Sequence, residues 1–314
     1  MSFSSKAKED LTKLQPRRRC CRTALLSALL QTAGSIQISG KEIKARLVTE
    51  SNAVARFGIA LAKSIFQLES EIFVKEKSNL GRLRNFEILL FGANAEYMLH
   101  ATGVLIGIGG GHEFGCGMPT ELDRNECCKR AFLKGAFLGG GSMSNPQKGY
   151  HLEFVLSSEG LAAYLCELLN SYHLNAKVVI RNGTNVIYLK ESDKITDFLA
   201  LVSANTAILE LQNIKAYKDF RNNLNRKVNC ETANLQKTVS ASVRQIENIR
   251  FLINELGLER IPEPLREIAE VRVNNPDSSL QELSALLSQQ LGKSGVNHRL
   301  RKLEAMAFEL KSHI

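Results

Sequence analysis

The sequence predicts an α+β fold, in which a duplicated αββαββ domain is followed by an all-α helix-turn-helix domain. Three observations support this prediction: a segment rich in small residues occurs twice, strand-like alternation follows each copy, and the last third has only helical periodicity. We therefore expect a pseudo-symmetric domain over residues 1–210, a polar linker or linker helix over 211–237, and a helical domain over 238–314.

The repeated segment covers residues 20–36 and 127–143. Cys20 aligns with Cys127 and Gly34 with Gly141, so the offset is 107, and six of the 17 aligned residues are identical. The same register continues without a gap beyond the segment, which indicates a duplicated unit. We place the two repeats at about 17–105 and 124–210.

Each copy has small residues at positions i, i+4 and i+8 of a predicted helix. They are Ala24, Ala28 and Thr32 in the first copy, and Ala131, Gly135 and Gly139 in the second. Glycine inside a helix costs roughly 1 kcal/mol relative to alanine, so Gly135 needs a packing reason. We predict that the two repeated helices pack closely against each other at the pseudo-twofold axis.

Both repeats show the same order of elements. The first is predicted to contain a helix over 17–33, strands over 36–39 and 46–50, a helix over 52–67, and strands over 71–77 and 84–90 with a turn at 79–81. The second is predicted to contain a helix over 124–139, strands near Met143 and over 151–156, a helix over 159–172, and strands over 177–181 and 186–190. The sequence Asn182-Gly183-Thr184 favours a hairpin between the last two strands. The Gly-rich stretch 106–116 lacks a phosphate-loop pattern and is interpreted as a flexible connection.

The segments 26–34 and 133–141 resemble the LAGLIDADG motif of homing endonucleases, which implies a surface shaped for DNA. Members of that family carry acids at two motif positions. This chain has Gln31 and Ala33 there in the first copy, and Leu138 and Gly140 in the second. Cleavage of a phosphodiester with divalent metal needs carboxylates to hold the ions. We therefore expect no catalytic residues and no nuclease activity.

The net charge of +9 favours an anionic partner without specifying it. Basic residues on the predicted strands could coat one face of the paired sheets, although basic residues on a solvated sheet face are common. They are Lys44, Arg46, Lys75, Lys77, Arg84, Lys148, Lys177, Arg181 and Lys190. No apolar run reaches the ~18 residues of a membrane span, so we expect no membrane association.

Seven cysteines, an odd number found mostly in predicted helices, are typical of a reducing cytoplasm. The pairs Cys20-Cys21 and Cys127-Cys128 raise the alternative of a zinc site with four thiolates. Adjacent residues of a helix point about 100° apart and do not match the usual C-x₂₋₄-C spacing. We therefore interpret both pairs as buried small apolar side chains, and predict no metal and no other cofactor.

The C-terminal third begins with a predicted amphipathic helix that ends at Gly257. Its inward stripe is expected to be Val239, Val243, Ile246, Ile249, Ile253 and Leu256. A second helix starts at Pro262 and Pro264 and ends before Pro276, and the capping box Ser279–Glu282 begins a third.

The last helix follows a turn through Gly292, with Val296, Leu300 and Leu303 predicted to face inward. The candidate DNA-binding residues lie on its other faces: Lys293, Ser294, Asn297, His298, Arg299, Arg301 and Lys302. A short helix, a turn and a basic helix are typical of a helix-turn-helix that binds double-stranded DNA. The alternative is a solvated basic helix in a small helical domain.

Segments 131–142, 262–269 and 293–302 together resemble the WhiA transcription regulators of Gram-positive bacteria, and the resemblance covers nearly the whole chain. It implies a sequence-specific regulator that binds promoter DNA at the nucleoid in the cytoplasm. In relatives it is tied to sporulation, cell division or chromosome segregation. The family's C-terminal module resembles region 4 of sigma factors, and actinobacterial members partner with a WhiB-type iron–sulfur protein, which implies a possible regulatory protein partner. The alternative function is a protein-interaction scaffold held on DNA by its C-terminal domain.

Overall fold

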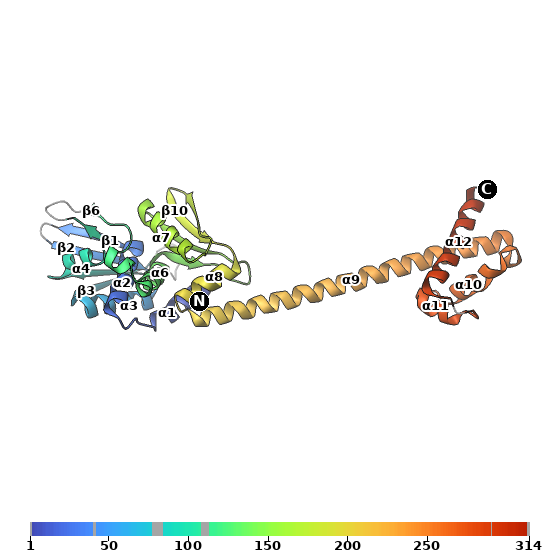
Figure 1. Cartoon of the computed structure of the whole chain (residues 1–314), viewed down its shortest axis with the longest axis horizontal. Helices are drawn as coiled ribbons and strands as arrows, with labels where there is room; N and C mark the ends of the chain where they lie inside the picture. Colours follow the sequence, from blue (N-terminus) through green and yellow to red (C-terminus); the bar gives the residue numbers. More distant parts are fainter. Residues whose placement is uncertain (1, 40–41, 77–83, 108–112, 290, 313–314) are drawn as a thin grey trace. The chain divides into compact units, whose positions relative to one another are not determined.

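The computed structural model describes residues 2–39, 42–76, 84–107, 113–289 and 291–312. The chain forms two compact units, Met1–Tyr217 and Lys218–Ile314 (Figure 1). Helix α9 (Asn205–Leu256) contributes residues to both units, and the predicted linker 211–237 lies inside it. Among the described residues, no helix combines the length and apolar character needed to cross a bilayer.

The first unit contains the two predicted αββαββ repeats, each followed by a short helix. The first repeat consists of α2 (Arg19–Ala33), β1 (Gly34–Ser39), β2 (Glu42–Thr49), α3 (Asn52–Phe66), β3 (Glu69–Glu76), β4 (Arg84–Phe91) and α4 (Ala95–Ala101). The second consists of α6 (Glu126–Gly140), β7 (Gly141–Met143), β8 (Leu152–Leu156), α7 (Glu159–Ser171), β9 (Lys177–Arg181), β10 (Thr184–Leu189) and α8 (Ser192–Leu201). The predicted α+β class and the duplication are confirmed.

The two sheets have equivalent topologies, β1-β2-β4-β3 and β7-β8-β10-β9, with antiparallel neighbours throughout. Asn182 and Gly183 both have positive φ, 51° and 75°, as a two-residue hairpin turn between β9 and β10 requires. The predicted turn over 79–81 lies outside the described residues.

Helices α2 and α6 form the close pair that the small residues predict, with α6 beside α2 in Figure 1. A Cβ placed on Gly135 would overlap the carbonyl oxygen of Leu25 and lie 2.9 Å from the Cβ of Ala28. A Cβ on Gly139 would overlap the hydroxyl of Thr32. Glycine at these positions is therefore required by the approach of the two helices.

Several short elements were not expected from the sequence. Helix α1 (Phe3–Thr12) buries Phe3, Ala7 and Leu11 in the core of the first unit. Strands β5 (Leu105–Ile106) and β6 (Glu113–Phe114) pair across the Gly-rich stretch, whose residues 108–112 lie outside the described residues, and α5 (Thr120–Asp123) precedes α6.

The second unit is all-α, as predicted. Its core is formed by the end of α9 together with a short 3-10 helix (Leu258–Arg260), α10 (Glu263–Asn274), α11 (Leu280–Leu286) and α12 (Lys293–Ser312). Leu252, Ile268, Leu283 and Leu300 are fully buried in it.

One prediction for α9 is wrong. Val239 and Val243 do not face inward; each side chain is 51% exposed. The buried positions on this part of the helix are Ser242, Gln245 and Ile249. Along this part of α9, apolar residues recur every three or four positions on a face that α10, α11 and α12 leave exposed. The spacing of apolar residues predicts a helix, but it does not show which face of that helix the neighbouring helices cover.

Candidate nucleic-acid interface

Helix α12 is anchored by the inward stripe that its sequence predicts. Val296 and Leu300 are fully buried and Leu303 nearly so, and Ala307 extends the same stripe by one further turn. These side chains pack with residues of α9, α10 and α11 in one apolar cluster. The orientation of α12 about its own axis is therefore fixed by the core.

Helix α11 begins with the predicted capping box. The Ser279 backbone N–H donates to the Glu282 carboxylate at 2.7 Å, and the Glu282 backbone N–H donates to the Ser279 hydroxyl at 3.3 Å. These hydrogen bonds from Ser279 hold the pKa of Glu282 below its usual value. The start of the first helix of the helix-turn-helix is thus defined by its own side chains.

The connection between α11 and α12 is held by contacts that the sequence does not reveal. The Ser284 hydroxyl donates to the carbonyl of Leu291, and the Ser288 backbone N–H donates to the carboxylate of Glu267 on α10. The bonds from Ser288, with a smaller contribution from the charge of Arg299, lower the pKa of Glu267. Arg299 therefore lies near an acid of α10, and Glu267 holds the turn in a way that no local sequence signal could predict.

The other candidate residues lie on or beside the outward face of α12. At about 100° per residue, Ser294, His298, Arg301 and Lys302 fall opposite the buried stripe. Lys293 and Asn297 flank this face. Asn297 is half-buried and the other five are exposed. The side chains of these six residues form no hydrogen bond or ion pair with another described residue. Arg299 lies on the opposite flank, so it is the one candidate residue separated from the rest.

On the first sheet, some cations of the predicted basic face are paired with carboxylates. Arg46 and Lys75 both contact the Glu87 carboxylate, at 2.5 and 2.7 Å, and these two cations lower the pKa of Glu87. Lys44 pairs with Glu42 at 3.1 Å. These three cations therefore already have carboxylate partners on the same sheet.

The predicted basic face of the second sheet is distributed over several elements. Lys177 and Arg181 are exposed at the two ends of β9. Nζ of Lys190 lies 4.9 Å from the ring centroid of Tyr188. Lys148 lies in the connection between β7 and β8 rather than on a strand, and Lys77 lies outside the described residues.

The motif positions that carry acids in homing endonucleases have other uses in this chain. The Gln31 amide donates to the Gly117 carbonyl and accepts from the Gly117 N–H, both at 2.8 Å, so it ties the connection between the repeats to α2. Leu138 is fully buried. The arrangement at Gln31 is one of structural hydrogen bonding rather than of metal ligation.

Three family models match consecutive parts of the chain. The WhiA N-terminal LAGLIDADG-like domain matches residues 19–105, the WhiA LAGLIDADG-like domain matches 129–221, and the WhiA C-terminal HTH domain matches 224–307.

Similar proteins match along nearly their whole length. Proteins named "Probable cell division protein WhiA" are 43% identical in Alkaliphilus metalliredigens (strain QYMF), covering 98% of both chains, and 46% identical in Desulforamulus reducens, covering 99% of this chain and 97% of the relative. The crystal structure of full-length DUF199/WhiA from Thermatoga maritima matches with a TM-score of 0.62 and 26% identity, covering 98% of this chain and 99% of that one. With its two LAGLIDADG-like repeats followed by a helix-turn-helix domain, this chain belongs to the WhiA family.

Proposed function

We propose that this chain is a transcription regulator that binds specific sites in double-stranded promoter DNA, with α12 as its reading helix. The observation that carries the proposal is the outward face of α12, whose polar and cationic side chains have no partner among the described residues. Ser294 and Asn297, near the start of the helix, are placed to hydrogen-bond base edges. Arg301 and Lys302, further along, are placed to neutralise phosphates.

The regulated process that fits best is cell division, since the relatives carry that name, with sporulation or chromosome segregation as related processes.

We propose that the chain has no nuclease activity, because the motif positions at the end of the helix pair are Ala33 and Gly140. Incubation with supercoiled plasmid and Mg²⁺ or Mn²⁺ should leave the plasmid intact. Metal-dependent nicking that co-purifies with the chain would contradict this.

The binding test compares promoter fragments with excess non-specific DNA over a salt series. Asn297→Ala should weaken specific binding by roughly 1–3 kcal/mol while leaving non-specific binding nearly unchanged, if the amide contacts a base. Arg301→Ala should weaken binding to all sequences and reduce the salt slope by about one, if the guanidinium contacts a phosphate. Arg250→Ala is the matched control, because it removes one exposed positive charge of the same unit from α9 rather than α12.

A protein-interaction scaffold held on DNA by its C-terminal domain remains the second candidate. The observation in its favour is the first sheet, where Arg46 and Lys75 already pair with the carboxylate of Glu87. If the full chain with both Asn297→Ala and Arg301→Ala binds no DNA at low salt, the first unit is free to serve a protein partner. If low-salt binding persists in that variant and is lost on Lys177→Ala together with Arg181→Ala, the sheets bind DNA as well.

A further inference from the structure

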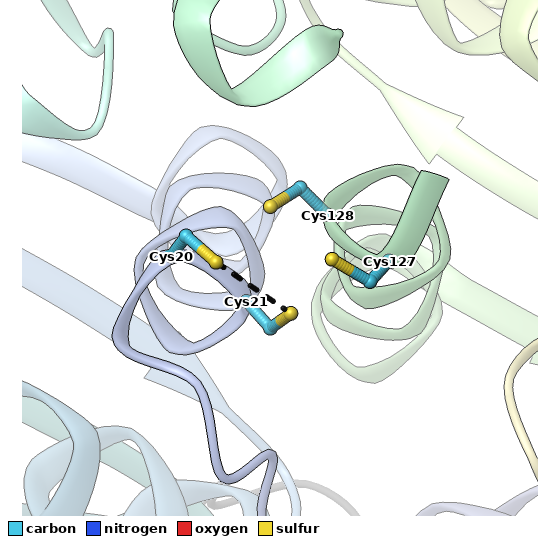
Figure 2. Close-up of side chains that lie close together, drawn as sticks. All are labelled: Cys20, Cys21, Cys127 and Cys128. Carbon is cyan, nitrogen blue, oxygen red and sulfur yellow. Dashed lines mark hydrogen bonds between the residues drawn. The ribbon is translucent and has the colours of Figure 1, made fainter. Parts of the chain in front are cut away.

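The two cysteine pairs of the repeated segment meet between α2 and α6. Each pair lies in the first turn of its helix: Cys20 and Cys21 follow Arg19, and Cys127 and Cys128 follow Glu126. Figure 2 shows the four side chains converging on the space between the two helices. The four sulfur atoms lie within 4.8 Å of one another, and all four thiols are free. These four residues are called the four-cysteine cluster below.

The spacing of the cysteines argues against a metal site within a single helix, but not against a site formed by two neighbouring helices. Adjacent residues on a helix diverge by about 100°, so both can still flank the line along which a neighbouring helix approaches. The pseudo-twofold axis then brings an equivalent pair from the second helix, because Cys20 corresponds to Cys127 and Cys21 to Cys128. Two ligands from each repeat make a four-ligand set that no C-x₂₋₄-C pattern would reveal.

The size of the cluster fits a single tetrahedral ion. A Zn–S bond of about 2.3 Å places the sulfurs of a tetrahedral site roughly 3.8 Å apart. Sγ of Cys20 and Sγ of Cys21 are 4.0 Å apart, and small rotations about χ1 would bring the wider pairs to the same separation. An iron–sulfur cluster places several iron and sulfide ions between the cysteine sulfurs and needs a wider cage. A disulfide needs about 2.0 Å, well below the 4.0 Å of that pair.

Cationic groups and helix N-termini surround the cluster, whereas burial raises the pKa of the Cys21 and Cys128 thiols. Cys21 and Cys128 are buried, whereas Cys20 and Cys127 are half-buried and leave a path for an ion to enter. Both pairs lie at helix N-termini, where the backbone amides favour negative charge. The Arg18 guanidinium approaches Sγ of Cys127 at 4.0 Å. Cationic side chains also flank each pair in sequence: Arg19 and Arg22 beside the first, Lys129 and Arg130 beside the second.

We propose that the four-cysteine cluster binds one zinc ion through four thiolates and so clamps the N-terminal ends of α2 and α6 together. Binding releases the four thiol protons to solvent and leaves a site of net charge −2, which Arg18 and the two helix N-termini offset. No electron transfer is involved, because zinc does not change its oxidation state. The site is structural: with four protein ligands there is no open position for a substrate.

The first test is the metal content of the full-length chain, purified with reductant and zinc and then desalted. Elemental analysis and native mass spectrometry should find one zinc ion per chain. Replacement of the zinc by Co²⁺ should give the strong sulfur-to-cobalt charge-transfer band and the intense visible bands of a tetrahedral thiolate site. Removal of the metal by a chelator should lower the melting temperature of the first unit, and zinc should restore it.

The decisive variant is Cys20→Ser with Cys127→Ser, because these two thiols are only half-buried and their replacement disturbs packing least. It should lose the zinc and the cobalt spectrum. The matched control is Cys116→Ser with Cys230→Ser, which removes two exposed thiols elsewhere and should keep both. Should the first variant not fold, the cobalt spectrum of the wild type decides the proposal alone.

Three results would overturn the proposal. They are zinc no higher in the wild type than in a folded Cys20→Ser/Cys127→Ser protein, cobalt bound without thiolate bands, or disulfides within the cluster that persist in protein freshly purified with reductant. Because the site lies in the first unit and its readouts involve no DNA, its failure would leave the assignment of α12 untouched.

Discussion

Substitution of Gly135 by alanine tests whether the close approach of α2 and α6 holds the first unit together. Alanine gains roughly 1 kcal/mol in helix propensity over glycine. Its Cβ, however, would overlap the Leu25 carbonyl oxygen, a backbone atom that cannot rotate away, and would lie 2.9 Å from the Cβ of Ala28. Overpacking of a dense core costs about 1–3 kcal/mol, and a backbone obstacle places this site at or beyond the upper end. We expect a net loss of about 2 kcal/mol.

The matched control is Gly58→Ala, a glycine inside α3 of the same unit. Its added Cβ would lie 3.0 and 3.3 Å from the terminal methyl groups of Leu47 and Leu29, which can move aside. The gain in propensity is the same, so the difference between the two variants measures the helix–helix clash. In thermal unfolding, about 2 kcal/mol should lower the melting temperature by roughly 4–8 °C for a unit of this size. Gly135→Ala that is as stable as Gly58→Ala would refute the close-pair interpretation.

Three further substitutions test single side chains. Gln31→Leu should destabilise the first unit by about 1–3 kcal/mol in denaturant titration, because it leaves the N–H and C=O of Gly117 unpaired; no change would mean that water replaces the amide. Ser279→Ala should cost the second unit about 1 kcal/mol by breaking the box with Glu282, measured by the same titration, and a change below ~0.3 kcal/mol would contradict it. Burial lowers the pKa of Lys134 to about 8 from 10.5, so between these values the unfolded chain holds more protons than the folded one, and stability must rise with pH. Relative to Lys134→Met, the wild type should therefore gain roughly 1–3 kcal/mol from pH 7.5 to 10, and a flat difference would contradict the burial of a charged amine.

Most elements of the first unit could be predicted because each is encoded by the residues within its own segment. Periods of two and of 3.6 residues marked the strands and helices, and a positive φ at Asn182 and Gly183 followed from the residues themselves. The helix pair was also predictable, since Gly135 had no other reason to sit inside a helix. The amphipathic helix α1 was not predicted, although Phe3 and Leu11, two turns apart, are both buried in the core.

The failures share one cause, which is that burial depends on what packs against an element. The apolar period of α9 gave no sign that Val239 and Val243 would remain uncovered. On α12 the sequence identified a polar surface, but only the packed structure places Arg299 near Glu267 and apart from the other candidates. A site shared by the two cysteine pairs was considered and set aside on the spacing within one helix, and that spacing says nothing about a second helix.

The hydrogen bonds of Gln31 make this position of α2 a poor place for an acid. A carboxylate at this position could still accept from the Gly117 N–H, but it has no proton to donate to the Gly117 carbonyl and would leave that oxygen opposite a negative charge. An acid in place of Gln31 would therefore loosen the join between the two repeats. Selection for folding alone would thus oppose a carboxylate at this position, whatever the surface beside it binds.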